Sequence, residues 1–561
     1  MSDTTTWSRQ PAVRRLPLVA PLRLARPSDM WFKPALSVVV ATAVPDLLLY
    51  AVGRLDLVMY TMAGSLCALY GHNLPYARRA RAVAGVVLGM VLGMAAALVA
   101  ASLTDSAAVL IAVGALLAAV QKTLCDATRI GPPGPVIFTF ITSASLFAPQ
   151  HLGQVPGHLA LTLAGGAFAW LVTAGPALLR REGPERRATA RALDAAAAHL
   201  AHPGPRTRHT AAAAVHAARQ TLLDTGRPTP ARRALERLVA DAEAALATAP
   251  APDPATAEQL RARARATRAR GPVPGTPEEF PGAGAGAGAE RAARRGPGRR
   301  EARRALLRRL APGSPLLPIG ARALLGCALA GYASQAAGVG RPYWAIVTAA
   351  ALFQANVTLS WHRAVQRTLG NLLGVLVFAA VLPLSRLTPL ALIGLCLFFA
   401  FMAEALITRN YWLGSVVVTP MALLVLEFAA THPAGELVRD RVLDTVIGAA
   451  AGLLATMLVT NRRAAGRLEL ALAATDRARL GAVRALAAPQ TGPEALDAAH
   501  RELAGSLVEL READDTAAGE WWQRALPRAQ VRAAEQAGHR TLAETATRRA
   551  SIARVPENGA V

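Results

Sequence analysis

The chain has 561 residues, of which 53% are hydrophobic and 17% are charged, and its formal net charge is +24 at pH 7. These values combine very apolar with very polar stretches, which excludes an ordinary string of soluble domains. The arginines gather in the tails and in the connections on one side of the apolar stretches, so we expect anionic lipid as their partner and no nucleic acid.

The chain begins with a polar, basic stretch, residues 1–34. It lacks a short apolar core followed by a cleavage site of small residues, so we expect no removable signal peptide. We interpret 1–34 as a cytoplasmic N-terminal segment.

Twelve apolar stretches follow, each a candidate transmembrane helix. A bilayer core of about 30 Å needs roughly 20 apolar residues per helix, and fewer where a span is packed inside protein. The stretches lie near 35–52, 57–70, 82–103, 107–124, 135–147 and 159–179, and near 323–338, 343–359, 369–384, 387–406, 411–429 and 442–460. We therefore predict an all-α integral membrane protein with two six-helix transmembrane halves, 35–180 and 316–460.

Basic residues mark alternate connections between these stretches. One side carries Arg78, Arg79, Arg81, Lys122, Arg129, Arg180, Arg181, Arg363, Arg367, Arg409, Arg462 and Arg463, whereas the opposite side has only Arg54, Arg341, Arg386, Arg439 and Arg441. Arginine and lysine are retained in short cytoplasmic loops. We expect a multi-pass protein of the inner (plasma) membrane with both termini in the cytoplasm.

The two halves resemble each other. Gly53-Arg54 after the first span corresponds to Gly340-Arg341, and a basic connection follows the second span of each half. Because each half has an even number of spans, the repeat is parallel. The second span is short in both halves, which indicates either a transporter's binding region or a tilted packing helix.

The segment 181–315 between the halves is polar and has an alanine-rich helical pattern. Its glycine-alanine repeat follows no strand, so we interpret it as a flexible linker rather than a nucleotide-binding loop. Next to the seventh span lies a polybasic stretch that we expect to bind lipid headgroups or to act as a topogenic signal. Its candidate residues are Arg299, Arg300, Arg303, Arg304, Arg308 and Arg309.

The tail, 461–561, is also predicted to be helical and cytoplasmic. Leu503, Leu507 and Leu510 recur at three- and four-residue spacing, so one helix face should pack against another element. We expect the tail and the central segment to form one helical bundle with a regulatory role.

Motifs for catalysis are absent. We find no phosphate-binding GxxxxGK[ST] loop, no HExxH and no GxSxG, so we expect no enzyme. The cysteines Cys67, Cys125, Cys327 and Cys396 lie in or beside apolar runs without a close pair, so we interpret them as packing residues and expect neither metal nor cofactor.

Ionisable residues in apolar spans are costly unless they are paired or functional. Asp46 is a candidate for proton coupling or for lining a water-filled path. Glu404 and Glu427 are further transport candidates, although Glu404 could pair with Arg409 at the end of its span. Asp444 lies three residues after Arg441, which is a pairing distance on a helix.

Candidates for an anion-binding site open the second half. Arg341 precedes Tyr343 and Trp344, and Arg363 and Arg367 follow the short second span. Arginine binds carboxylates, and neighbouring aromatic rings could receive an aromatic acid. The alternative is that the tyrosine and the tryptophan are ordinary interface anchors.

The second half resembles the integral-membrane domain of the fusaric acid resistance family, the aromatic acid exporters. The likeness rests on Arg341-Pro-Tyr-Trp-Ala345, Gln354, Arg363, Gln366-Arg367-Thr-Leu-Gly370, Gly374, Arg409-Asn-Tyr411, Thr419-Pro420, Arg441, Asp444 and Gly448. It implies proton-coupled efflux of aromatic or other amphipathic organic acids.

Other functions are compatible with the same features. The family is similar to plant anion channels of the malate type, so an organic-anion channel is one alternative. A carrier of the major facilitator type is another, although the long insert and tail are unusual there. A third is a membrane scaffold without transport, and a homo-oligomer is possible in each case.

Overall fold

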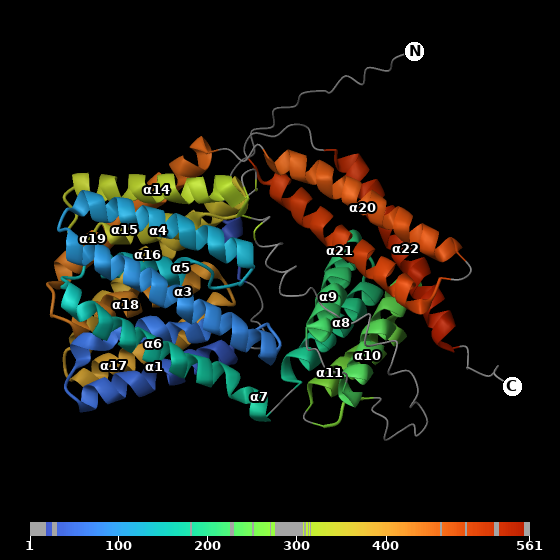
Figure 1. Ribbon diagram of the computed structural model, residues 1–561, viewed down its shortest axis with the longest axis horizontal. Coiled ribbons are helices and arrows are strands. Elements are labelled where there is room, and N and C mark those ends of the chain that lie inside the picture. The colour runs from blue at the N-terminus through green and yellow to red at the C-terminus, as the bar shows by residue number, and fades with distance from the viewer. Residues whose placement is uncertain are drawn as a thin grey trace, which may run out of the picture.

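The computed structural model describes residues 18–24, 31–179, 182–224, 229–248, 252–269, 271–274, 307, 310–311, 314, 316–459, 463–488, 491–520 and 527–554. Every regular element in these ranges is helical, which confirms the predicted all-α class. The helices form two bodies (Figure 1). We call them the membrane domain, with the helices of both apolar halves, and the polar helical domain, with α8–α11 and α20–α22.

The first half of the membrane domain contains six apolar helices. They are α1 (Phe32–Ala51), α2 (Val58–Ser65) with η3 (Leu66–Leu69), α3 (Tyr76–Leu103), α4 (Ala107–Thr128), α5 (Val136–Leu146) and α6 (Val155–Ala174). The second half has α14 (Leu316–Ala336), α15 (Tyr343–Leu352), α16 (Val357–Ser385), α17 (Pro389–Ile407), α18 (Tyr411–Leu424) with η6 (Val425–Phe428), and α19 (Ala434–Leu458).

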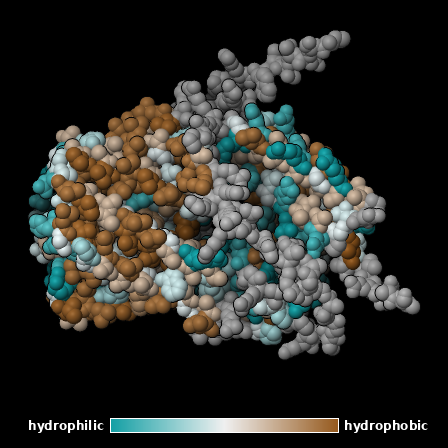
Figure 2. Space-filling model, in the orientation of Figure 1, coloured by the Kyte–Doolittle hydropathy of each residue, from teal (hydrophilic) through white to brown (hydrophobic). Residues whose placement is uncertain are grey.

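Within the described residues, nine helices are long and apolar enough to cross a membrane, and three shorter apolar helices accompany them. Leucines on the outer faces of the long helices are exposed, including Leu88, Leu92 and Leu376. Figure 2 shows that hydrophobic residues cover much of the visible face of the membrane domain. An apolar surface of this extent is stable in lipid and not in water, so the chain is a multi-pass membrane protein.

The predicted span 343–359 is wrong at its end. Helix α15 stops at Leu352, and α16 begins at Val357. The cause is Asn356, whose side chain accepts a hydrogen bond from the backbone N–H of Leu359 at 2.9 Å and thereby starts a new helix. Arg363 and Arg367 consequently lie inside α16 and not in a connection.

Glycines allow α16, α18 and α19 to approach their neighbours closely. A Cβ atom at Gly370 would lie 2.5 Å from the carbonyl oxygen of Trp412, and one at Gly448 would lie 2.6 Å from that of Ala345. Small residues are the usual means of close helix packing in membranes. They bring α15, α16, α18 and α19 together around one centre.

The polar helical domain lies at one end of the membrane domain, which we call the inner end (Figure 1). It comprises α8 (Gly183–Ala201), α9 (Pro205–Leu223), α10 (Pro230–Thr248), α11 (Pro254–Arg268), α20 (Arg463–Ala487), α21 (Pro493–Ala518) and α22 (Arg528–Arg554). Helix α21 packs on α9, and α22 packs on α10. The predicted association of the central segment with the tail is therefore present.

Candidate functional site

The centre of the second half contains a buried arginine that forms no ion pair with the described residues. Arg441 of α19 is 2% exposed, and its Nε and Nη1 atoms are buried without a hydrogen-bond partner among the described residues. Its guanidinium carbon lies 4.1 Å from the centre of the Trp344 ring on α15. Such a contact contributes roughly 2 kcal/mol when it is desolvated. Burial of an unpaired charge costs several kcal/mol, so the contact offsets only part of that cost.

A second buried arginine lies next to the first. Nη1 of Arg367 on α16 donates to the hydroxyl of Tyr411 at 2.8 Å, whereas Nε has no described partner. Arg363, one turn earlier, lies over the Tyr411 ring at 3.8 Å. The charges of Arg367 and Arg441 interact unfavourably across this centre. Two buried like charges raise the affinity of the centre for an anion.

Carboxylates in this region are only partly engaged. Asp440 accepts a hydrogen bond from Arg341 at 3.1 Å. Asp444 is 0% exposed, and its Oδ1 accepts a hydrogen bond from Ser334 of α14, while Oδ2 is buried without a described partner. No ion pair within the described residues joins Asp444 to Arg441, because these side chains contact α14 and α15, respectively. The expected pair is thus not formed.

Helix α15 carries further unsatisfied donors. Nε1 of Trp344 is buried without a described partner, and so is the hydroxyl of Thr348, one turn further along α15. Nearby, Asn371 donates to Thr445 at 3.2 Å and accepts from Thr419 at 3.0 Å, so this polar group is satisfied. Unsatisfied N–H groups and two guanidinium ions at one point are the complement of an anion such as a carboxylate.

Aromatic residues of the first half line one side of this centre. Phe140 of α5 stacks on Trp344 with the ring centres 5.4 Å apart, and Phe147 lies 5.9 Å from the ring of Tyr343. The short helices α5 and α15 are therefore in contact between the halves. The centre that we call the arginine site, made of Arg367, Arg441 and Trp344, needs both halves.

The structure brings together five of the predicted site residues. Arg341, Tyr343, Trp344, Arg363 and Arg367 lie at or beside the arginine site. The polybasic candidates Arg299, Arg300, Arg303, Arg304, Arg308 and Arg309 fall outside the described residues.

The other predicted carboxylates lie elsewhere. Asp46 of α1 is buried, and its Oδ1 has no described partner; its carboxylate lies near Cys396 of α17. Glu404, also on α17, forms no ion pair with Arg409 in the described part of the chain. Glu427 accepts hydrogen bonds from Arg386 at 2.9 Å and 3.0 Å, so it is a satisfied partner in an ion pair.

Arg441 was not predicted as a site residue. Its span is predicted to begin at residue 442, which assigns Arg441 to a connection, whereas α19 begins at Ala434. Residues Glu436 to Asp440 are mostly polar, so a hydropathy profile does not include the first turns of α19 in the span. The helical periodicity of the apolar residues, rather than their average hydropathy, is the signal that would place Arg441 two turns inside α19.

Three side chains of α16, α18 and the residue before α18 bind the N-terminal segment. Gln366 and Asn410 donate to the carbonyl oxygen of Pro21 at 2.7 Å and 2.8 Å, and Trp412 donates to that of Leu22 at 3.2 Å. These residues hold residues 18–24 against the inner ends of α16 and α18 and do not enter the arginine site.

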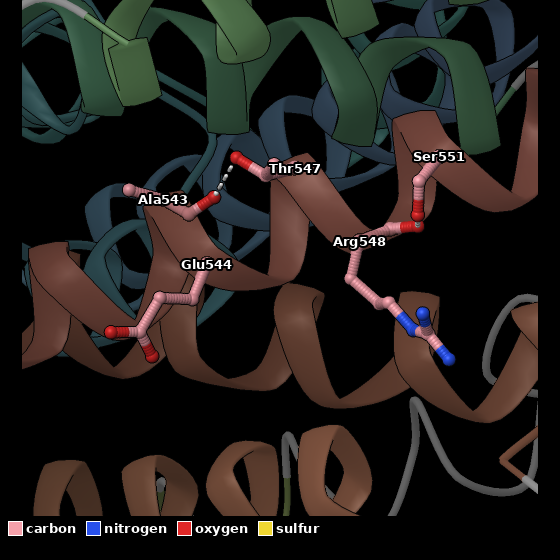
Figure 3. Close-up of a pocket in the computed structure, with 5 residues that line it drawn as sticks. All are labelled: Ala543, Glu544, Thr547, Arg548 and Ser551. Atoms are coloured by element: carbon pink, nitrogen blue, oxygen red, sulfur yellow. Dashed lines mark hydrogen bonds between the residues drawn. The ribbon is translucent and has the colours of Figure 1, made fainter. Parts of the chain in front are cut away.

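A hollow on the polar helical domain is unrelated to this centre. It lies along α22 and is lined by Ala543, Glu544, Thr547, Arg548 and Ser551 (Figure 3). All its lining residues belong to one helix, and Thr547 only donates to its own helix, to the carbonyl of Ala543 at 3.0 Å. We assign no function to it.

The fold and the arginine site define a polytopic membrane protein with a buried, arginine-containing centre. Residues 329–455, from α14 to α19, match the family model described as fusaric acid resistance protein-like. The match includes Arg341, Arg367 and Arg441, and it confirms the resemblance predicted from the sequence. The family is of a membrane transporter type.

The chain is also similar to a curated protein, the uncharacterized membrane protein YvaC of Bacillus subtilis (strain 168). The two are 33% identical over 190 residues, which are 33% of this chain and 28% of the relative. The chain thus aligns with less than a third of the relative's length. No solved structure matches the chain.

Proposed function

We propose that this protein is a secondary transporter that exports small organic anions, with Arg441 and Arg367 binding the carboxylate. The observation that carries the proposal is the buried guanidinium of Arg441, which has two N–H groups without described partners. A bound carboxylate would supply the missing charge and accept hydrogen bonds from both groups. The stacked rings of Trp344 and Phe140 support an aromatic or amphipathic substrate.

Efflux is the direction supported by the description of the matching family. Asp46 is the candidate for coupling to protons, because a buried carboxyl group without a full set of partners gains and loses a proton as its surroundings change. It lies on α1 against α17, apart from the contacts that make the arginine site. Proton and anion would therefore use different parts of the membrane domain. We further propose the inner membrane as location, with both termini in the cytoplasm.

A scaffold without transport is less well supported. If the buried acids served only the fold, each should have its partners, yet Asp46 and Asp444 each keep a buried oxygen without one. An anion channel shares the arginine site with a transporter. The two differ in whether flux follows the membrane potential alone.

The test uses the purified full-length protein in liposomes with salicylate as a fluorescent probe. Arg441→Gln should lower salicylate affinity about 10- to 100-fold, because a charge-assisted hydrogen bond contributes about 1.5–3 kcal/mol. Arg409→Gln, which changes an exposed arginine of the same half, is the control. Equal transport by both variants and the wild type would refute the site, and a potential-driven current without proton dependence would identify a channel.

A further inference from the structure

We propose that the C-terminal end of α21 is a latch that closes the inner mouth of the arginine site, so that the polar helical domain controls access to it. The latch consists of Gly519 and Glu520, held by Arg322 and Asn356. This inference rests on the proposed transport function and concerns the regulation of the same site.

The latch occupies a break in the membrane domain. Residues 353–356, between α15 and α16, are not helical. Non-helical backbone at membrane depth needs partners from the protein or from water. Helix α15 ends at Leu352, eight residues after Trp344 or about 12 Å along the helix at 1.5 Å per residue, and the break follows directly. It is therefore the interruption of the helices that lies between the arginine site and the inner end.

The end of α21 supplies partners for this break. The carbonyl oxygen of Gly519 accepts hydrogen bonds from the backbone N–H of Thr358 at 3.1 Å and from its hydroxyl at 3.0 Å. Asn356 donates to the carbonyl oxygen of Asp515 at 3.2 Å. A helix start leaves N–H groups without intrahelical partners, and here the tail satisfies one of them.

The fit at Gly519 leaves no room for a side chain. A Cβ atom there would lie 2.2 Å from the Cγ and Nδ2 atoms of Asn356. Asn356 thus serves two roles, since it caps α16 with its oxygen and contacts the latch with its nitrogen. A movement of α21 would remove a hydrogen bond from the residue that separates α15 from α16.

A buried ion pair completes the contact. Arg322 of α14 is 0% exposed, and its guanidinium donates to Glu520 at 3.1 Å and to the carbonyl oxygen of Val459 at 2.7 Å. Val459 directly follows α19, which contains Arg441, and α14 contains Ser334, the partner of Asp444. The latch therefore connects α14 with α19, the helix that carries Arg441 and Asp444.

The ion pair between Arg322 and Glu520 can be broken when α21 moves. Burial raises the pKa of Glu520 in spite of the nearby charge of Arg322. The desolvation cost of the carboxylate thus exceeds the gain from pairing, as is common for buried ion pairs. Such a pair specifies where α21 ends, and removal of one partner releases the contact because the other charge is then buried and unpaired.

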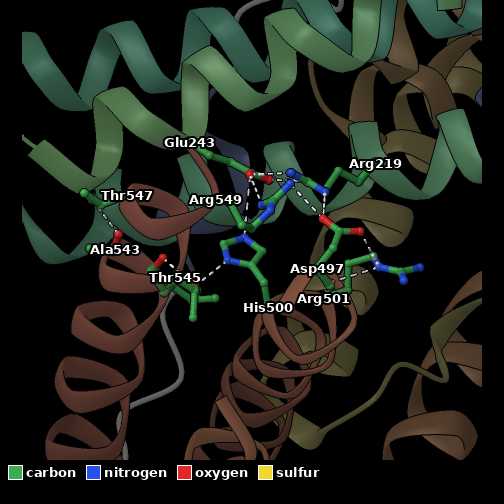
Figure 4. Close-up of polar contacts among 10 residues, drawn as sticks. Arg219, Glu243, Asp497, His500, Arg501, Ala543, Thr545, Thr547 and Arg549 are labelled. Carbon is green, nitrogen blue, oxygen red and sulfur yellow. Dashed lines mark hydrogen bonds and ion pairs between the residues drawn. The ribbon is translucent and has the colours of Figure 1, made fainter. Parts of the chain in front are cut away.

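The other end of α21 is fixed within the polar helical domain. Figure 4 shows Asp497 and His500 of α21 beside Glu243 of α10, together with Arg219 and Arg549. Arg219 donates to Asp497 at 3.1 Å, and Arg549 pairs with Asp497 at 2.7 Å and with Glu243 at 3.1 Å. Helix α21 is thus a continuous rod from this network to the break, and a rearrangement of the domain would move the latch.

The first test does not require transport. In a variant with the four native cysteines changed to alanine, Thr348→Cys places a thiol on α15 one turn from Trp344, on the side of the break, and a charged methanethiosulfonate reagent is added to the protein in nanodiscs. Glu520→Gln should increase the labelling rate severalfold, whereas Glu512→Gln, an exposed change on α21, should leave it unchanged. Equal rates in both variants would overturn the latch.

The second test locks the contact. Asn356→Cys with Gly519→Cys should form a disulfide on oxidation, because the two side chains would be in contact. Oxidation should abolish salicylate transport and reduction should restore it; unchanged transport on oxidation would overturn the latch. If no variant transports salicylate, the proposed function fails, and the labelling rates still decide whether the latch closes the inner mouth.

Discussion

Arg441 of α19 lies over the ring of Trp344 on α15, with its guanidinium carbon 4.1 Å from the ring centre, and this contact joins the charge of the site to its aromatic wall. The Trp344 ring covers one face of the Arg441 guanidinium, and no described carboxylate forms an ion pair with that guanidinium. Because Phe140 of the first half stacks on the Trp344 ring, the contact also depends on how the halves meet.

Replacement of Trp344 should weaken anion binding. We expect Trp344→Leu to lower salicylate affinity roughly tenfold, because a desolvated cation–π contact of about 2 kcal/mol positions Arg441. Trp344→Phe should have a smaller effect, since it keeps an aromatic face for Arg441 while it loses the indole N–H and part of the ring area. Equilibrium binding in detergent would measure both, with Trp170→Leu, far from the site, as control. Unchanged affinity in Trp344→Leu would contradict a positioning role.

Neutralisation of Asp444 should strengthen anion binding. Asp444→Asn removes a negative charge near Arg441 and retains the oxygen that accepts from Ser334. We expect salicylate affinity to rise roughly tenfold, because charges in a low-dielectric interior interact strongly. Asp440→Asn is the comparison. It removes the charge that pairs with Arg341, so its effect should be on the surroundings of Arg341. A fall in affinity for Asp444→Asn would show that this carboxylate supports the site.

The coupling of salicylate efflux to protons should depend on Asp46. We expect salicylate efflux from wild-type liposomes to respond to an imposed pH gradient, and Asp46→Asn to abolish that response while salicylate binding remains. Asp105→Asn, an exposed change in the connection between α3 and α4, should behave as the wild type. A response retained in Asp46→Asn would place proton coupling at another residue.

Acid should loosen the polar helical domain through His539. Burial, with the charges of Arg208, His209 and His199, lowers the pKa of His539 to about 4. The unfolded chain, with a pKa of about 6.5, therefore binds more protons between these values, and stability falls as the pH drops from about 6.5 towards 4.

Hydrogen exchange of α22 in the full-length protein would measure this effect. Exchange should be faster at pH 5 than at pH 7 after correction for the intrinsic rate, by a free energy on the order of 1–2 kcal/mol. His539→Gln should reduce the difference, and His202→Gln, an exposed change, should not. A difference of the same size in His539→Gln would assign the effect to other groups.

Much of the membrane domain is predictable because each span carries its own signal. The short second span of both halves is confirmed, as α2 with η3 and as α15. The start of α16 was missed because one side chain, Asn356, interrupts an apolar run that hydropathy treats as continuous. The predicted cluster of Arg341, Tyr343 and Trp344 follows from neighbouring positions in the chain. Arg367 joins them only through the packing of α16 on α18 and α19.

That this chain lies in a membrane follows from its amino-acid sequence alone, because the cost of exposing apolar residues to water depends on composition and length and not on tertiary contacts. That Arg441 forms no ion pair with the described residues is a consequence of tertiary packing. Asp440 turns to Arg341 and Asp444 to Ser334, so Arg441 keeps free N–H groups. Whether a charge is paired depends on partners that other helices bring within a few ångströms, and local sequence does not contain those distances.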